Sequence, residues 1–86
     1  MRLDKFLKVS RLIKRRTVAK EMCNKGRISV NGQIAKAGTN IKIDDEIAIQ
    51  FGPKLVTVRV KAIKEMIRKE EAESMYTVVS EKKVEH

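Results

Sequence analysis

The dipeptide Asn31-Gly32 constrains the fold of this chain more than any other feature. Ile28 and Val30 alternate with Ser29 directly before it. Asn-Gly beside alternating apolar residues is the strongest short-range hairpin signal, because both central residues of the favoured turn need positive φ. With two helical segments before this hairpin and further alternating segments after it, the predicted class is α+β: two short N-terminal helices packed on a small, mainly antiparallel sheet.

The first helix is predicted from the spacing of its apolar residues. Leu3, Phe6 and Leu7 recur at i, i+3 and i+4, which places them on one helical face and lets the helix end near Ser10. Asp4 falls in the first turn, where a carboxylate offsets the helix dipole and accepts a free amide hydrogen. A structural role is therefore favoured for Asp4 over a catalytic one.

A basic connector over residues 11–16 leads into a second helix, predicted from about Arg16 to Lys25 and stopped by Gly26. Arg16 and Lys20 lie one turn apart on its polar side, where like charges repel. That repulsion is explained if an external anion neutralises both side chains. The predicted apolar stripe of this helix consists of Val18, Ala19, Met22 and Cys23.

Alternating apolar residues continue after the hairpin. Odd-numbered residues from Ile41 to Phe51 predict two half-buried strands separated by an acidic turn at Asp44-Asp45, and a turn at Gly52-Pro53 precedes a further strand over 55–60. A short helix ending near residue 75 and a strand over 76–79 are predicted next, followed by fraying of residues 80–86. The predicted organisation is a domain over 1–63 and a C-terminal extension over 64–86.

The positive charge of the chain lies in its first 36 residues. Eleven Lys and Arg stand against two acids there, which accounts for the whole net charge of +9, and the remaining fifty residues carry nine of each sign. Such segregation indicates a polyanionic partner. Nucleic acid is favoured over a membrane surface, because the apolar residues of the first helix have core spacing.

Nine of these cations are predicted to contact nucleic acid. Arg2, Arg15 and Arg16 rank first, because arginine grips phosphate with a planar fork or stacks on a base. Aromatic stacking is not expected, since Phe6 and Phe51 have core spacing and Tyr76 lies outside the basic region. The full predicted set is Arg2, Lys5, Arg11, Lys14, Arg15, Arg16, Lys20, Lys25 and Arg27.

Catalysis is not expected in a chain of 86 residues, which leaves little volume for an enclosed active site. Cys23 is the only cysteine and reads as a small buried hydrophobe, and the only histidine, His86, is expected to be disordered. Metal ligation by Asp44, Asp45 and Glu46 is disfavoured against a solvated loop. No apolar run reaches the length of a membrane span, so the expectation is a cytoplasmic, monomeric protein without cofactor or metal.

Taken together, these residues resemble the S-four RNA-binding domain, named after small-subunit ribosomal protein four. The segments MRLDKFL, IKRR, KEM, LVTVRVKAI and EEAESMY extend the resemblance to its single-domain, ribosome-associated branch. Arg15 departs from the family, which often caps the second helix with Ser or Thr, so the cap is missing or is taken over by Thr17. The matching residues are Arg2, Leu3 and Asp4, then Arg16, Ala19, Lys20, Met22, Cys23 and Gly26, then Ile28, Val30, Asn31 and Gly32, and finally Asp45 and Ile47.

The resemblance implies an S-four-like fold, the αL motif, and RNA binding through the two helices and the hairpin. The implied site is a large ribosomal subunit that carries a stalled peptidyl-tRNA. The implied role is to assist template-free addition of C-terminal residues, mainly alanine, beside a larger tail-elongating protein. A DNA-binding regulator with a helix-turn-helix-like basic surface is the alternative, since two short helices with a basic second one are typical of both.

Overall fold

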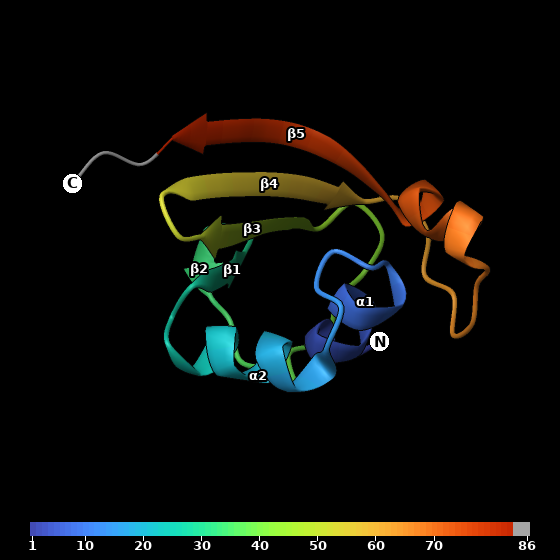
Figure 1. Ribbon diagram of the computed structural model, residues 1–86, viewed down its shortest axis with the longest axis horizontal. Coiled ribbons are helices and arrows are strands. Elements are labelled where there is room, and N and C mark those ends of the chain that lie inside the picture. The colour runs from blue at the N-terminus through green and yellow to red at the C-terminus, as the bar shows by residue number, and fades with distance from the viewer. Residues whose placement is uncertain (84–86) are drawn as a thin grey trace.

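A helical layer covers one face of a five-stranded antiparallel sheet in the computed structural model, which describes residues 1–83 (Figure 1). The strand order is β2-β1-β3-β4-β5, and the predicted α+β class is confirmed. The helices are α1 (Leu3–Val9), α2 (Arg16–Asn24) and the 3-10 helix η1 (Lys69–Met75). The strands are β1 (Ile28–Val30), β2 (Gln33–Ile34), β3 (Glu46–Phe51), β4 (Lys54–Val60) and β5 (Tyr76–Lys83).

The predicted hairpin is confirmed. Asn31 and Gly32 have φ values of 51° and 84°, and Val30 pairs with Gln33 across the turn. The Asn31 side chain accepts a hydrogen bond from the Glu46 amide at 2.9 Å. The hairpin tip is thereby attached to the start of β3, the strand that pairs with β1 on its other edge.

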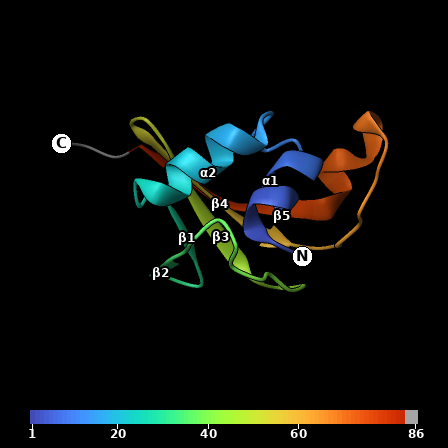
Figure 2. The ribbon, with the colours of Figure 1, turned by 90° about the horizontal axis from the view of Figure 1, so that it is seen from below.

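Helices α1 and α2 lie across the same face of the sheet (Figure 2). Leu3, Phe6 and Leu7 of α1 are completely buried, as their spacing predicts. The inward residues of β3 and β4 complete the core, and they are Ile47, Ile49, Val56, Val58 and Val60. The predicted alternation of β4 is therefore confirmed.

The apolar stripe of α2 is narrower than predicted. Ala19 and Cys23 are buried and Met22 is half-buried, but 39% of Val18 is exposed. α2 begins at Arg16, and its N-cap, Arg15, makes no side-chain capping bond. The cap is therefore missing, and Thr17 does not replace it.

The prediction of two strands between Ile41 and Phe51 is wrong, because only β3 forms. Ile41 is buried, whereas 56% of Ile43 is exposed. The chain turns over residues 42–45, just before β3. Asp44 has a φ of 76°, and the Asp45 amide donates a hydrogen bond to the Lys42 carbonyl. The acidic turn itself forms as predicted, and it breaks the alternation on which the extra strand rested.

The C-terminal segment is also more ordered than predicted. The predicted short helix forms as η1 and buries Ala72 and Met75. Fraying is wrong for residues 80–83, which belong to β5 and pair with β4 as far as the Lys54–Lys83 pair. Residues 84–86, including His86, lie outside the described residues.

Candidate nucleic-acid interface

A buried carboxylate lies at the centre of the basic region. Asp4 has no exposed side-chain surface, although it belongs to the most basic part of the chain. Its oxygens accept hydrogen bonds from Arg2 Nε at 3.2 Å, Arg16 Nε at 3.1 Å and the Lys5 amide at 2.8 Å. Asp4 therefore has the structural role predicted for it, and it also holds two arginines from two helical segments.

The electrostatics of this cluster keep Asp4 ionised. Burial by itself raises the pKa of the Asp4 carboxyl. The hydrogen bond and charge of Arg16 oppose that effect, the Lys5 amide and Arg2 add to the opposition, and the pKa lies below its ordinary value of 3.8. A buried charge is tolerated here because it is both paired and hydrogen-bonded.

Arg2 and Arg16 each use the same edge of the guanidinium. Besides Nε, Arg2 donates from Nη2 at 3.4 Å and Arg16 from Nη2 at 3.5 Å. Because a guanidinium has five N–H donors, donors remain on the opposite edge of each side chain. The side chains of Arg2 and Arg16 are 54% and 40% exposed, so each is partly open to a partner.

Arg16 has an internal partner that the sequence did not show. Asp4 opposes part of its charge, but the same carboxylate also pairs with Arg2, so the cluster keeps one positive charge. The partner of Arg16 lies 12 residues away on α1, and no pattern within the second helix reveals such a contact. Sequence spacing therefore singled out Arg16 but did not reveal its pairing with Asp4.

The loop over residues 36–40 contacts Arg2 and the start of α1, although the sequence did not point to it. The Thr39 carbonyl accepts a hydrogen bond from the Leu3 amide at 2.8 Å, and Arg2 forms a β-bridge with Asn40. A Cβ on Gly38 would lie 3.7 Å from Arg2 Nη2. The loop therefore contacts both the backbone and the side chain of Arg2.

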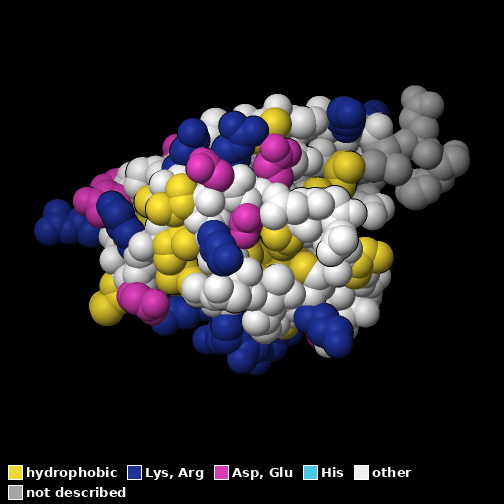
Figure 3. Space-filling model, turned by 180° about the vertical axis from the view of Figure 1, so that it is seen from behind, with side chains coloured by type: hydrophobic (Ala, Val, Ile, Leu, Met, Phe, Trp, Pro, Cys, Tyr) yellow, Lys and Arg dark blue, Asp and Glu magenta, His cyan; other side chains and the backbone are white. Residues whose placement is uncertain are grey.

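Six of the nine predicted cations are exposed and have no ion pair within residues 1–83. The other three are Arg2 and Arg16, bound to Asp4, and Lys5, bound to Glu65. Figure 3 shows Lys and Arg side chains gathered along the lower edge of the molecule, where the helices lie. The six exposed cations are Arg11, Lys14, Arg15, Lys20, Lys25 and Arg27.

One aromatic residue was wrongly assigned to the core. Phe6 is buried, but 37% of Phe51 is exposed, because it is the last residue of β3 and lies at the turn into β4. Phe51 lines a surface hollow together with Lys25 and Arg27. An apolar ring is therefore present on the basic surface.

The remaining candidate groups have local partners. Cys23 is buried as predicted, and burial together with the charge of Asp4 raises the pKa of its thiol. Asp45 accepts a hydrogen bond from the Lys42 amide, and Glu46 forms an ion pair with Arg59.

Within residues 1–83, no helix is long and apolar enough to cross a bilayer.

A pair of short helices that bring arginines and lysines to one face of a small antiparallel sheet is the arrangement that the sequence motifs suggested. Residues 1–47 match the family described as the S4 domain, and the chain belongs to this family. Similarity to individual members of the family extends over almost the whole chain.

The chain is 63% identical to the RQC P-site tRNA stabilizing factor of Halalkalibacterium halodurans, over 98% of this chain and 96% of that protein. It is 60% identical to the protein of the same name from Bacillus subtilis, over 98% of each chain. A solved structure, the trimeric heat shock protein 15 of Vibrio cholerae, superposes with a TM-score of 0.86 at 31% identity. That superposition covers 93% of this chain and 82% of the other.

Proposed function

We propose that this protein is a non-catalytic RNA-binding factor that contacts ribosomal RNA and P-site tRNA on large ribosomal subunits with a stalled nascent chain. The observation that carries the proposal is the set of six exposed cations between residues 11 and 27, together with two arginines paired with one buried carboxylate. The name of the relatives at 60% and 63% identity supports the choice of tRNA and ribosome.

The chemistry of the surface suits structured RNA. Double-helical RNA is recognised through its shape, phosphates and sugar hydroxyls, because side chains cannot read its deep major groove. Arginines whose one edge is fixed by Asp4 present the other edge in a defined orientation, which lowers the entropy lost on gripping a phosphate. The exposed lysines add phosphate contacts and a long-range field.

The finer role rests on the resemblance to the quality-control branch of the family. We propose that the protein acts as a monomer and supports the addition of C-terminal residues, mainly alanine, to the stalled chain. A larger tail-elongating protein would carry out the chemistry. By stabilising P-site tRNA, the protein would keep the acceptor of each new residue in place.

The test is sedimentation of tagged protein from cells through a gradient. Wild-type protein is expected with free large subunits that carry tRNA, and recovery only in ribosome-free fractions would overturn the proposal. The informative variant replaces three exposed cations, Arg15, Lys20 and Lys25, by alanine, because none of them has an ion pair within residues 1–83. This variant is expected to remain folded but to sediment no longer with the large ribosomal subunits.

The matched control replaces three exposed lysines outside the basic region, Lys42, Lys61 and Lys82, which removes the same charge. With about six phosphates neutralised, the log-log salt slope of RNA binding is expected at roughly −4 to −5 in the wild type. The slope should become about three units shallower in the first variant and much less so in the control. Equal or better binding to duplex DNA would favour the regulator instead.

A further inference from the structure

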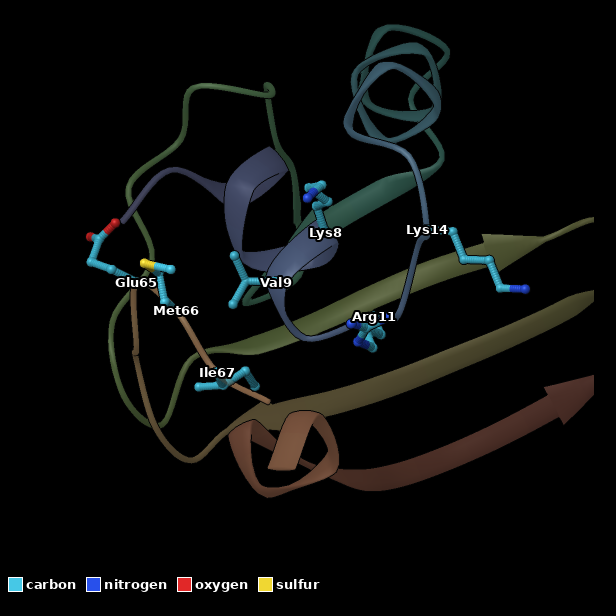
Figure 4. A pocket seen from close by; sticks show the side chains of 7 residues that line it. All are labelled: Lys8, Val9, Arg11, Lys14, Glu65, Met66 and Ile67. Atoms are coloured by element: carbon cyan, nitrogen blue, oxygen red, sulfur yellow. The ribbon is translucent and has the colours of Figure 1, made fainter. Parts of the chain in front are cut away.

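A surface hollow of about 350 Å³ lies at the C-terminal end of α1 (Figure 4), whereas Asp4 lies in the first turn of that helix. We call it the α1 hollow. Lys8 and Val9 of α1 and Arg11 and Lys14 of the connector line one part of it. Residues 65–67, from the segment between β4 and η1, line the rest.

The backbone of Arg11 is strained at this position. Arg11 follows the C-cap of α1 and has a φ of 63°, and its amide donates to the Lys8 carbonyl at 3.0 Å. Helices often end with one residue in this left-handed conformation, but that residue is usually glycine or asparagine. Helix termination alone therefore does not explain an arginine here, and strain of this kind clusters at functional sites.

The α1 hollow combines unpaired cations with an apolar wall. Within residues 1–83, Lys8, Arg11 and Lys14 have no ion pair. The one acid of the hollow, Glu65, is bound to Lys5, and the hydrogen bond and charge of that lysine lower the pKa of its carboxyl. The positive charge of the hollow is therefore not balanced from inside it.

One residue of the apolar wall is open to solvent. Met66 is 90% exposed, whereas Val9 and Ile67 pack against the core. In Figure 4, the apolar residues Val9, Met66 and Ile67 lie on one side of Arg11. Lys14 lies on the other side and extends away from them. A thioether makes favourable contacts with aromatic rings.

We propose that the α1 hollow is a second RNA subsite, which takes an unpaired nucleotide bulged from a duplex. Its phosphate would lie against Arg11 and Lys8, and its base would pack on Met66. The proposal rests on the proposed RNA-binding function. An unstacked nucleotide fits this hollow because it carries both a phosphate and an aromatic base. The phosphate complements the positive charge, and the base complements the apolar wall.

The test compares two RNA hairpins of equal length, one fully paired and one with a single unpaired uridine, by fluorescence anisotropy. Wild-type protein is expected to bind the bulged hairpin about fivefold to tenfold more tightly, the scale of one modest base contact. Met66→Ala should abolish this preference and leave binding to the paired hairpin unchanged. Ile43→Ala removes a comparable exposed apolar side chain elsewhere and should retain the preference.

Arg11→Gly separates binding from folding. It should raise Tm by a few degrees, because glycine adopts the left-handed conformation without strain. It should also weaken binding to both hairpins and reduce the salt slope by about one. Arg11→Lys should keep the slope without raising Tm.

The outcomes distinguish the two proposals. If wild-type protein binds both hairpins equally, or if Met66→Ala keeps the bulge preference, the second subsite is refuted and the proposed function stands. The same holds if Arg11→Gly leaves the affinity and the salt slope unchanged. If wild-type protein binds neither hairpin nor large ribosomal subunits, both proposals are overturned.

Discussion

Removing the arginines around Asp4 is expected to destabilise the protein through the carboxylate that they leave behind. Arg16→Ala deletes hydrogen bonds of 3.1 and 3.5 Å, while Arg2 keeps its own contacts with the same carboxylate. Hydrogen bonds to charged groups contribute about 1.5–3 kcal/mol. Because Arg16 is 40% exposed, we expect a loss of about 2 kcal/mol, which corresponds to a Tm lower by roughly 8–16 °C in a domain of this size.

Replacing both arginines leaves only the Lys5 amide on the buried carboxylate. Asp4 then escapes its uncompensated charge by taking up a proton. From its ordinary pKa of 3.8, protonation at pH 7 costs about 4 kcal/mol, which limits the penalty for the charge. Since a chain of 86 residues has a total stability of roughly 4–13 kcal/mol, the double variant should be close to unfolding.

A third substitution makes this reasoning testable. Adding Asp4→Ala to the double variant removes the buried charge, so the triple variant should regain about 2 kcal/mol despite its extra truncation. Urea unfolding followed by circular dichroism measures all of these variants, since the chain has no tryptophan. A triple variant less stable than the double would refute the reasoning, as would a double variant as stable as the wild type.

The pH dependence supplies a second signature of the same effect. In the wild type the pKa of Asp4 is lowered, so its contribution is present above pH 3.8 and is lost as the pH falls through the lower, folded-state value. In the double variant burial raises that pKa, so stability should increase as the pH falls from 7 towards 4. The slopes for Asp4 are therefore opposite in the two proteins, and the triple variant should show neither.

Two further predictions concern single positions. Gly26→Ala should lower the free energy of unfolding by about 1 kcal/mol, because Gly26 has a φ of 71°. Space is not the cause, since Ile34 Cδ1 would lie at an ordinary 3.6 Å from the new Cβ. Thermal unfolding measures the effect, and Gly38→Ala, where φ is not left-handed, is the control that should change little. Cys23 should react with a thiol reagent at pH 8 at least about tenfold more slowly in the folded protein than in urea, because burial and the charge of Asp4 raise its pKa. Equal rates in the two conditions would contradict its position in the core.

The parts of the fold that were predictable are those encoded over a few residues. The hairpin follows from the backbone preferences of Asn31 and Gly32, and the buried face of α1 follows from the spacing of Leu3, Phe6 and Leu7. The alternation of odd-numbered apolar residues gave a wrong prediction at Ile43, because the turn at Asp44 reverses the chain before β3 begins. Periodicity is informative only while the backbone stays regular.

The parts that were missed depend on partners distant in sequence. Residues 80–83 are polar enough to fray alone, and they are ordered by hydrogen bonds to β4, more than twenty residues away. The sequence predicts Asp4 to be a helix stabiliser and Arg16 to be an RNA contact, but nothing local connects the two residues. The concentration of positive charge is visible in the sequence, whereas the pairing of Asp4 with Arg16 depends on how α1 packs against α2.

That pairing changes how loss-of-function variants of the basic surface are interpreted. Arg16 is both the partner of a buried carboxylate and a donor with a free edge, so reduced RNA binding after Arg16→Ala has two explanations, a lost contact and a loosened fold. The lysines and arginines without an ion pair in residues 1–83 have only the first. Arg16→Lys separates the two at Arg16 itself, because lysine keeps a charge beside Asp4 but cannot form the planar fork that grips phosphate. If that variant stays folded and still loses RNA, the free edge of Arg16 makes the contact.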